Sequence, residues 1–343
     1  MTIEAGKKLD ATIVIPVKNG GERLEQVLDM VDRQETEFSY EVVCVDSGST
    51  DDSVAVIRRH NCILKEIAPE EFGHGKTRNL GASLGTGEFI LFLTQDAVPA
   101  DTHWLDEMLK AVKSDDGIAG GFGIHYPYPD CNLPDQLMLQ EHFARFGTEN
   151  MTFEITDENR SLYEEDEGYR QYLAFFSDNN SCLRRSVWER IPYDDVDYAE
   201  DQFWARKILE QGYKKVYCPK AGVYHSHNYP LASYGKRYYD DFKAVYRVYG
   251  TVLCPDVKAY IRGILGPTKH ECGFILRKRD LSLTEKIKWC LYSGIRNCMR
   301  CTASVRAVKY FRAPKEQQES MDRRYSQQYL QIKGTNNTNG EKH

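Results

Sequence analysis

The sequence predicts an α/β protein in which a mainly parallel sheet is flanked by helices and followed by a helical C-terminal appendage. Short apolar runs alternate with segments of helical periodicity through the first third of the chain, a pattern typical of parallel strands joined by right-handed crossovers. Two of these runs, residues 11–17 and 89–93, are apolar throughout, as expected of strands covered on both faces. Beyond residue 231 the pattern becomes helical and basic.

The composition is that of an ordinary globular protein. Of the 343 residues, 41% are hydrophobic and 28% are charged, and the formal net charge of -6 argues against a surface that coats nucleic acid. The ten cysteines are scattered and complete no zinc site, which favours a reducing cytoplasm. The first ten residues do not resemble a signal peptide, and no apolar run approaches the ~20 residues of a membrane span. We therefore expect a cytoplasmic protein that can contact the inner face of the cell membrane only from its surface.

The expected elements follow from local periodicity and from turn residues. Glycine and short polar side chains between the apolar runs supply turns and helix caps. Strands are expected at residues 11–17, 40–45, 62–67 and 89–93, and helices at 22–34, 53–60, 77–84 and 102–112.

Two of the expected strands end on an acid. Asp46 follows the second strand and is suited to holding a nucleotide, whereas the alternative is an Asx-turn or helix N-cap. Asp96 follows the strand at 89–93 and is suited to a hard divalent cation that also binds phosphates, whereas the alternative is a cap of the helix at 102–112. The first strand is not followed by a dinucleotide fingerprint.

A basic, glycine-containing loop precedes the helix at 77–84. His74, Lys76 and Arg78 can neutralise a diphosphate, and Gly75 permits close approach of the backbone. The spacing is not that of a Walker loop. The alternative is a solvated basic loop that only starts the helix.

Together these segments resemble a known family. The ordered set Val45-Asp46-Ser47-Gly48, Arg78-Asn79-x-Gly81 and Thr94-Gln95-Asp96 is similar to the motifs of inverting family 2 glycosyltransferases with the GT-A fold. The longer stretches 72–81 and 93–97 resemble the bacterial rhamnosyltransferase branch. The resemblance extends from about residue 10 to residue 239.

This resemblance implies a nucleotide-sugar donor, linked to dTDP or UDP, and a divalent cation, Mg²⁺ or Mn²⁺, that bridges its diphosphate. Thr94 replaces the first acid of the usual D-x-D motif, so metal binding rests on Asp96 and a more distant ligand, His225 or His227. Histidines at i and i+2 in an extended segment point to the same face, although such a pair is often structural. The donor contacts that the resemblance implies come from Pro16, Lys18, Asn19, Asp46, Ser47, His74, Arg78 and Gln95.

The second carboxylate comes from Glu200-Asp201, which precedes an amphipathic helix. The helix dipole favours the ionised form of Asp201, and an ionised carboxylate can remove the proton of an acceptor hydroxyl. The resemblance gives this role of catalytic base to Asp201, whereas the alternative is an N-terminal capping pair. Glu200 and Asn180 are expected to position the acceptor or the sugar.

The domain boundaries expected from these patterns are 1–232 for the GT-A catalytic domain, 233–316 for a basic helical region and 317–343 for a disordered tail. The donor half spans about 10–125 and the acceptor half about 126–232. Residues 251–313 contain thirteen Lys and Arg against four Asp and Glu. Such helices can lie on an anionic membrane, or can pack on the catalytic domain or a second subunit. The acidic stretch at 149–172 is expected to be a solvated loop, with an acceptor-side lid as the alternative.

The resulting hypothesis is a metal-dependent inverting glycosyltransferase. It would move L-rhamnose from dTDP-rhamnose to a hydroxyl of a bacterial surface glycan or lipid-linked oligosaccharide, with no nucleic acid as partner. The alternatives are a glycosyltransferase that uses another UDP- or dTDP-linked sugar, a nucleotidyltransferase, and a non-catalytic glycan-binding scaffold.

Overall fold

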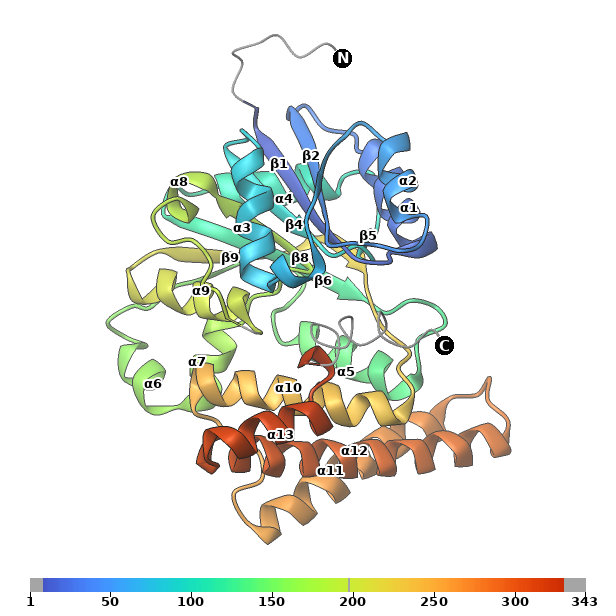
Figure 1. Ribbon diagram of the computed structural model, residues 1–343. Helices are drawn as coiled ribbons and strands as arrows, with labels where there is room; N and C mark the ends of the chain where they lie inside the picture. Colours follow the sequence, from blue (N-terminus) through green and yellow to red (C-terminus); the bar gives the residue numbers. More distant parts are fainter. Residues whose placement is uncertain (1–8, 197, 330–343) are drawn as a thin grey trace. The chain divides into compact units, whose positions relative to one another are not determined.

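A computed structural model describes residues 9–196 and 198–329 (Figure 1). Internal contacts divide the chain into two compact units. Among the described residues, the first comprises 9–128 together with 142–196 and 198–226, and the second comprises 129–141 and 227–329. Among the helices of the described residues, none has both the length and the apolar character that crossing a membrane requires.

The first unit is built on a nine-stranded sheet in the order β3-β2-β1-β4-β8-β6-β9-β5, with β7 paired to β9 (Figure 1). The pairs among β1 to β4 are parallel, which confirms the predicted strand–helix alternation. Beyond β4 the sheet is mixed, because β8 runs antiparallel to both β4 and β6 while β6 and β9 are parallel. The strands are β1 (Ala11–Val17), β2 (Tyr40–Asp46), β3 (Cys62–Glu66), β4 (Phe89–Leu93), β5 (Val98–Pro99), β6 (Ile118–Tyr126), β7 (Met151–Phe153), β8 (Asn180–Arg184) and β9 (Lys214–Tyr224).

Helices cover both faces of this sheet. Apolar residues of α1, α2 and α4 join one strand face in a single hydrophobic core, and α3 packs on the opposite face of β1 and β2. Gly81 permits that close packing, since a Cβ atom there would lie 2.3 Å from the Val14 side chain. The helical elements of the first unit, including these four, are α1 (Gly21–Asp32), α2 (Ser53–Arg59), the 3₁₀ turn η1 (Pro69–Glu71), α3 (His74–Leu84), α4 (Trp104–Lys113), α6 (Arg160–Glu165), α7 (Glu167–Ala174), α8 (Arg185–Trp188) and α9 (Glu200–Glu210).

The acidic stretch at 149–172 is not the solvated loop that we expected. It forms β7, α6 and α7, and two local interactions explain the helices. The Asp166 carboxylate caps α7 by accepting a hydrogen bond from the Tyr169 N–H (2.7 Å), and the Arg170 guanidinium bonds the carbonyl oxygen of Tyr163 (2.9 Å).

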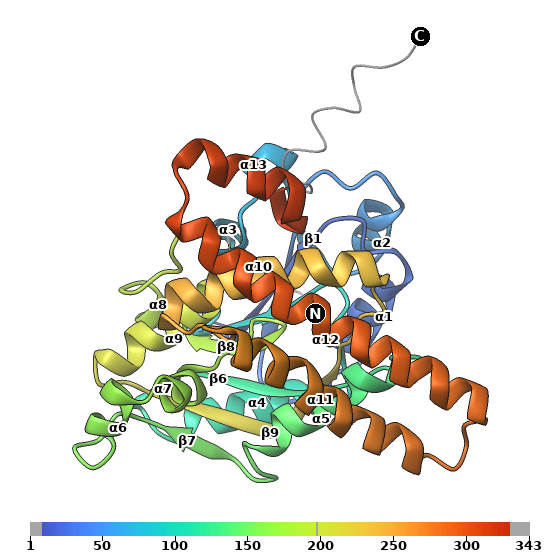
Figure 2. The ribbon, with the colours of Figure 1, turned by 90° about the horizontal axis from the view of Figure 1, so that it is seen from below.

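The second unit is helical. Its elements are the first part of α5 (Leu133–Ala144), then α10 (Leu231–Tyr249), α11 (Val257–Arg277), α12 (Leu283–Arg312) and α13 (Lys315–Tyr325). Figure 2 shows α11 and α12 running side by side. This unit also includes residues 129–141, which we had placed in the acceptor half, and the domain boundaries that we expected stay predictions.

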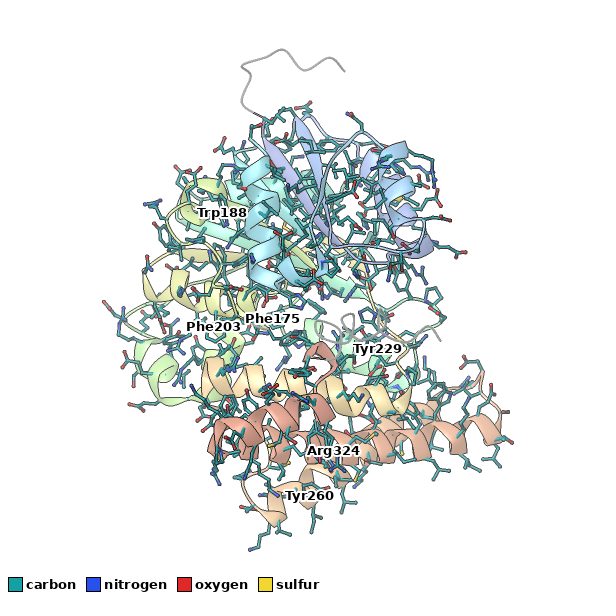
Figure 3. The ribbon with its side chains drawn as sticks, viewed as in Figure 1. Phe175, Trp188, Phe203, Tyr229, Tyr260 and Arg324 are labelled. Atoms are coloured by element: carbon teal, nitrogen blue, oxygen red, sulfur yellow. The ribbon has the colours of Figure 1, made fainter. Side chains whose placement is uncertain are left out.

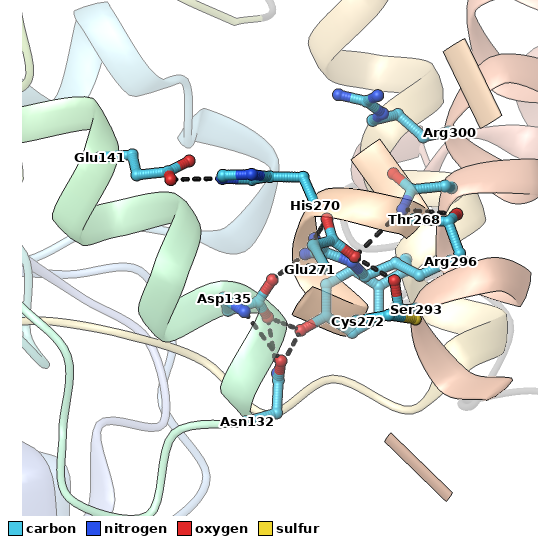
Figure 4. A network of polar contacts seen from close by, with 12 residues as sticks. Asn132, Asp135, Glu141, Thr268, His270, Glu271, Cys272, Ser293, Arg296 and Arg300 are labelled. Atoms are coloured by element: carbon cyan, nitrogen blue, oxygen red, sulfur yellow. Dashed lines mark hydrogen bonds and ion pairs between the residues drawn. The ribbon is translucent and has the colours of Figure 1, made fainter. Parts of the chain in front are cut away.

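A buried polar network joins α5, α11 and α12 (Figure 4). The Arg296 guanidinium pairs with the carboxylates of Asp135 and Glu271, the latter at 2.8 Å. Asn297 and Ser293 donate to Glu271, the former at 3.0 Å. Because buried charges are tolerated only when paired, this network fixes which faces of the helices meet.

Residues 317–325, the first part of the tail that we expected to be disordered, are helical in the structure. Lys315–Tyr325 form α13, whose Tyr325 ring packs against Tyr239 at 5.9 Å and whose Asp322 carboxylate pairs with the ammonium of Lys243 at 2.5 Å. A polar sequence therefore becomes helical because α10 supplies a partner for it. The tail from residue 330 lies outside the described residues.

Candidate active site

The loops that follow β1, β2 and β4 are bonded to one another. The Gln95 amide accepts a hydrogen bond from the backbone N–H of Lys18 (2.7 Å) and donates one to its carbonyl oxygen (3.0 Å). The Lys18 ammonium donates to the carbonyl oxygens of Ser47 and Gly48, each at 2.8 Å. The three loops thus form one cradle at the carboxyl ends of parallel strands, where open α/β sheets bind ligands.

Asn19 and Asp46 shape this cradle. Asn19 has a left-handed backbone conformation (φ 51°), and its side-chain oxygen accepts from the Thr50 N–H at 2.8 Å. The buried Asp46 carboxylate accepts from the N–H groups of Gly48 and Ser49, each at 3.0 Å, and so forms the Asx-turn that we considered as its alternative. A nucleotide role for Asp46 stays a prediction.

Pro16 and Ser47 lie directly beside these residues. Pro16 is in β1 opposite Val45 of β2, and the buried Ser47 hydroxyl donates to the Val17 carbonyl oxygen at 3.0 Å. His74 begins α3, with its ring 5.1 Å from that of Phe72. Six of the residues predicted for the donor thus lie together at the carboxyl ends of β1, β2 and β4, namely Pro16, Lys18, Asn19, Asp46, Ser47 and Gln95, whereas His74 begins α3.

Arg78 lies within a cluster of acidic side chains. Its side chain is buried, and the guanidinium lies 2.7 Å from Glu200 Oε1 and 3.2 Å from Asp178 Oδ2. Burial acts to lower the pKa of Arg78, but the charges of Glu200 and Asp178 raise it above its ordinary value. The cation is thus engaged by two carboxylates of the acceptor half, and its predicted contact with a diphosphate stays a prediction.

Asp178 is a central residue that the sequence analysis missed. Its Oδ1 accepts hydrogen bonds from the hydroxyls of Ser181 and Tyr193, each at 2.7 Å. Its backbone N–H donates to Asp201 Oδ2 at 3.1 Å. The polar run 177–181 was visible in the sequence, but nothing in it distinguished Asp178 from its neighbours, because the partners Arg78 and Tyr193 are distant along the chain.

Asp201 stands at the first turn of α9, after Ala199 in a left-handed conformation (φ 63°). A non-glycine residue in that conformation stores strain, which is typical of functional sites. Burial, followed by the charges of Glu200 and Asp178, raises the pKa of Asp201 well above its ordinary value, and hydrogen bonding by the Asp178 N–H only partly opposes this. The pKa of Asp201 is therefore shifted in the direction opposite to the one that we expected from the helix dipole.

The charge balance explains this shift. Three carboxylates, those of Asp178, Glu200 and Asp201, surround one guanidinium, and Arg78 pairs with the first two. Asp201 is the acid without a direct ion pair to Arg78, although the residue keeps part of its surface exposed. A partly exposed carboxylate with a raised pKa is a better proton acceptor than an ordinary aspartate and is therefore suited to the role of general base.

Asp96 and His225 form a second subsite. The Asp96 side chain is 26% exposed, and its Oδ1 lies 3.5 Å from His225 Nε2. The His225 ring packs against the buried ring of His125 at 5.6 Å, and burial lowers the pKa of His125 well below its usual range, so that this neighbour is neutral. His227 follows two residues later, where the second unit begins. Asp96, His225 and His227 are candidate ligands for a metal ion.

One loop connects the two subsites. Asp178 contacts Asp201 through its backbone, and the side-chain amide of the next residue, Asn179, lies 3.4 Å from His225 Nδ1. The antiparallel pairing of β4 with β8 places the end of β4, before Asp96, beside the start of β8, after Asn179. The sheet therefore brings together an acid with a raised pKa and a carboxylate–imidazole pair.

Asn180 does not contact either subsite. Its side chain is fully buried, accepts from the Trp104 indole N–H at 2.8 Å and donates to the Ala221 carbonyl oxygen at 2.7 Å. Both ends of the amide thus serve the core, and a role of Asn180 in positioning a sugar stays a prediction. Asn79 has a similar role, since it accepts from the indole N–H of Trp188, which Figure 3 labels.

Comparisons with known proteins agree with this geometry. Residues 12–190 match the family described as glycosyl transferase family 2. The chain is 31% identical over 234 residues to the O-antigen chain rhamnosyltransferase WbaN of Salmonella anatum, and 33% identical over 233 residues to the O-antigen chain rhamnosyltransferase RfbN of Salmonella typhimurium. Each match covers 67% of this chain and 70% of the relative.

A solved structure shows the same fold. The mannosyltransferase PcManGT of Pyrobaculum calidifontis, in complex with GDP-Man and Mn²⁺, is similar with a TM-score of 0.52 and 18% sequence identity. The similarity covers 89% of this chain and 87% of that one.

Proposed function

The chain belongs to glycosyl transferase family 2 and has the GT-A fold, and on this basis we propose that it transfers L-rhamnose from dTDP-rhamnose to a bacterial surface glycan or lipid-linked oligosaccharide. Glycosyl transfer itself follows from the family, whereas the donor and the acceptor are proposed. The support for them is the similarity, along two thirds of the chain, to two proteins named O-antigen chain rhamnosyltransferases. A cytoplasmic location stays a prediction.

One observation carries the mechanism: the loop at 178–180 holds Asp201 on one side and the Asp96–His225 pair on the other. We assign Asp201 as the general base. It takes the proton of the acceptor hydroxyl while the oxygen attacks the anomeric carbon, and the bond from that carbon to the diphosphate oxygen breaks. Arg78 is a positioning residue, because it fixes Glu200 and Asp178 around the base.

On the donor side, the bonded loops of Lys18, Asp46 and Gln95 would hold the nucleotide at the sheet edge. Asp96 and His225, with His227 as a further ligand, fit a divalent cation, since they offer a carboxylate and imidazoles and the similar mannosyltransferase was solved with Mn²⁺. When bound, such a cation neutralises the charge of the departing diphosphate.

We expect Asp96→Asn to weaken Mn²⁺ binding in the presence of dTDP by at least about 100-fold, because an amide oxygen replaces a charged ligand; the loss of an outer partner alone costs 10- to 100-fold. Titration calorimetry with MnCl₂ measures this directly, without turnover. Asp101→Asn is the matched control, since Asp101 is an exposed acid of the same unit. Unchanged Mn²⁺ affinity in Asp96→Asn would remove Asp96 from the metal site.

The raised pKa of Asp201 predicts the pH dependence of the reaction. A base must be deprotonated to act, so kcat/KM should fall as pH decreases through the pKa of Asp201. We expect the midpoint of this acid limb clearly above the ordinary value for aspartate, about 3.9. A pH profile at subsaturating donor measures it. An acid limb at the ordinary aspartate value would contradict the assignment of the base.

The donor is tested by a panel of nucleotide sugars. Purified protein is incubated with dTDP-rhamnose, UDP-glucose, UDP-N-acetylglucosamine and GDP-mannose, each with Mn²⁺ or Mg²⁺ and with chelator, and the released nucleotide is quantified. We expect the highest kcat/KM with dTDP-rhamnose. Preferential turnover of a UDP sugar would instead favour the alternative glycosyltransferase, and release of pyrophosphate rather than a nucleoside diphosphate would indicate a nucleotidyltransferase.

A further inference from the structure

The helices α11 and α12 carry rows of exposed aliphatic side chains. On α12 the exposed residues recur every four positions, and side chains at that spacing lie on one face of a helix. Eight of the fifteen large hydrophobic residues that are exposed in the described part of the chain belong to these two helices. They are Val257, Ile261, Leu265 and Leu276 on α11, at 49–74% exposure, and Leu283, Ile287, Leu291 and Ile295 on α12, at 50–72%.

These side chains are not needed to join the two helices. The contacts between α11 and α12 are made by other residues, including Glu271 with Ser293 and Asn297, and Gly263, where a Cβ atom would lie 2.9 Å from Cys301 Sγ. The two helices run beside each other (Figure 2), so their exposed rows belong to one hairpin. A concentration of exposed apolar surface of this kind marks a site of interaction.

The hairpin is also basic. Residues 257–295 contain eight Lys and Arg against three Asp and Glu, and one of the acids, Glu271, is buried in the network of Figure 4. A depression of about 460 Å³ at the start of α11 shows the same combination, because Val257 and Tyr260 line it together with Arg306 and Lys309 (Tyr260 is labelled in Figure 3). The exposed cations of the hairpin are Lys258, Arg262, Lys269, Arg277, Arg279 and Lys288.

Charge decides between two occupants of this surface. In a symmetric dimer, the α11–α12 surface of one subunit would contact the same surface of the other subunit, and the cations on the two surfaces would repel one another. A bilayer of anionic phospholipids offers the opposite charge together with an apolar layer into which Leu and Ile side chains can insert. We infer that the α11–α12 hairpin docks on the surface of an anionic phospholipid bilayer. This inference does not depend on the sugar that the enzyme transfers.

Vesicle flotation of the full chain tests the inference. We expect binding to equimolar phosphatidylglycerol and phosphatidylcholine vesicles, little binding to pure phosphatidylcholine, and weakening at high salt. The double variant Ile287→Gln/Leu291→Gln should reduce the apparent vesicle affinity at least about tenfold, since two inserting side chains are lost. Arg277→Gln/Arg279→Gln should reduce the preference for the anionic vesicles.

The matched control is Ile63→Gln/Leu162→Gln, which removes two exposed aliphatic side chains of the first unit, at 41% and 47% exposure. It should bind vesicles as wild type does. Thermal unfolding followed by circular dichroism checks that each variant is folded. Absence of wild-type binding to the anionic vesicles, or an equal loss in the control, would overturn the inference. The inference would also be overturned if light scattering showed that the wild type is a dimer, that Ile287→Gln/Leu291→Gln is a monomer, and that the wild type does not bind vesicles.

Discussion

Replacing Asp201 by Asn should lower kcat for sugar transfer by about 10²- to 10⁴-fold, the range that general-base catalysis contributes. Asn keeps the shape of the side chain and an oxygen that can accept from Asp178 or Gln202, but it cannot take a proton. The loss corresponds to about 3–5 kcal/mol in the activation free energy. Initial rates at saturating donor and acceptor measure kcat, and calorimetry with dTDP shows whether donor binding persists.

Asp116→Asn is the control, since Asp116 is an exposed acid of the same unit and its replacement should leave kcat within twofold of wild type, as expected of a surface change.

The pH dependence of stability supplies a second test of the same residue. Because the folded protein raises the pKa of Asp201, wild type binds this proton more tightly when folded and loses stability as pH rises through the raised pKa. The Tm of Asp201→Asn relative to wild type should therefore rise with pH. Near-normal transfer by a folded variant would exclude Asp201 as the base.

Replacing Arg78 by Met should destabilise the protein by about 3–5 kcal/mol, because it removes one partner of a buried ion pair. Glu200 and Asp178 would then lie buried without the cation that contacts them at 2.7 Å and 3.2 Å. Urea unfolding followed by tryptophan fluorescence measures the free energy of unfolding, and three of the four tryptophans, Trp104, Trp188 and Trp204, belong to the first unit.

A matched surface pair calibrates this experiment. Arg58 lies 2.9 Å from Glu66, and both side chains are more than half exposed, so Arg58→Met should cost less than about 1 kcal/mol. Arg78→Lys should recover only part of the loss, since an ammonium cannot bridge two carboxylates as a guanidinium does. The cost of Arg78→Met should be smaller at low pH, where the stranded acids are protonated. A loss as small as that of Arg58→Met would show that the cluster does not depend on Arg78.

The parallel half of the sheet was predictable because local signals agree there. The short and mainly apolar runs at 11–17 and 89–93 are typical of strands covered on both faces, and the turn residues between them indicate the helix starts. The acids at strand ends, Asp46 and Asp96, follow from the same pattern. The mixed half of the sheet was not predictable, because β8 pairs with β4 across nearly ninety residues of sequence and no local feature specifies that partner.

The contacts at the site that the sequence did not indicate depend on the fold in the same way. Arg78 in a basic loop looks ready for a phosphate, and only the fold reveals the two carboxylates that engage it. Asp201 at a helix start is expected to be ionised from the sequence, and only the fold reveals that burial and two neighbouring acids raise its pKa. From the sequence, Asn180 is one of several polar residues in a site loop. In the fold, its side-chain oxygen accepts from the Trp104 indole and its side-chain nitrogen donates to the Ala221 carbonyl oxygen. The partners of Arg78 and Asn180 are distant in sequence, whereas Asp201 is affected by burial, by its chain neighbour Glu200 and by the more distant Asp178.

The central claim is a single displacement in which Asp201 deprotonates the acceptor while the sugar leaves its diphosphate. The configuration of the anomeric carbon tests it most directly, and NMR of the purified product, compared with the nucleotide sugar that is turned over, measures that configuration. Direct attack by one activated hydroxyl predicts inversion in every product molecule. Retention of the donor configuration would require a different mechanism, one in which Asp201 is not the base of a direct attack, and would contradict the account.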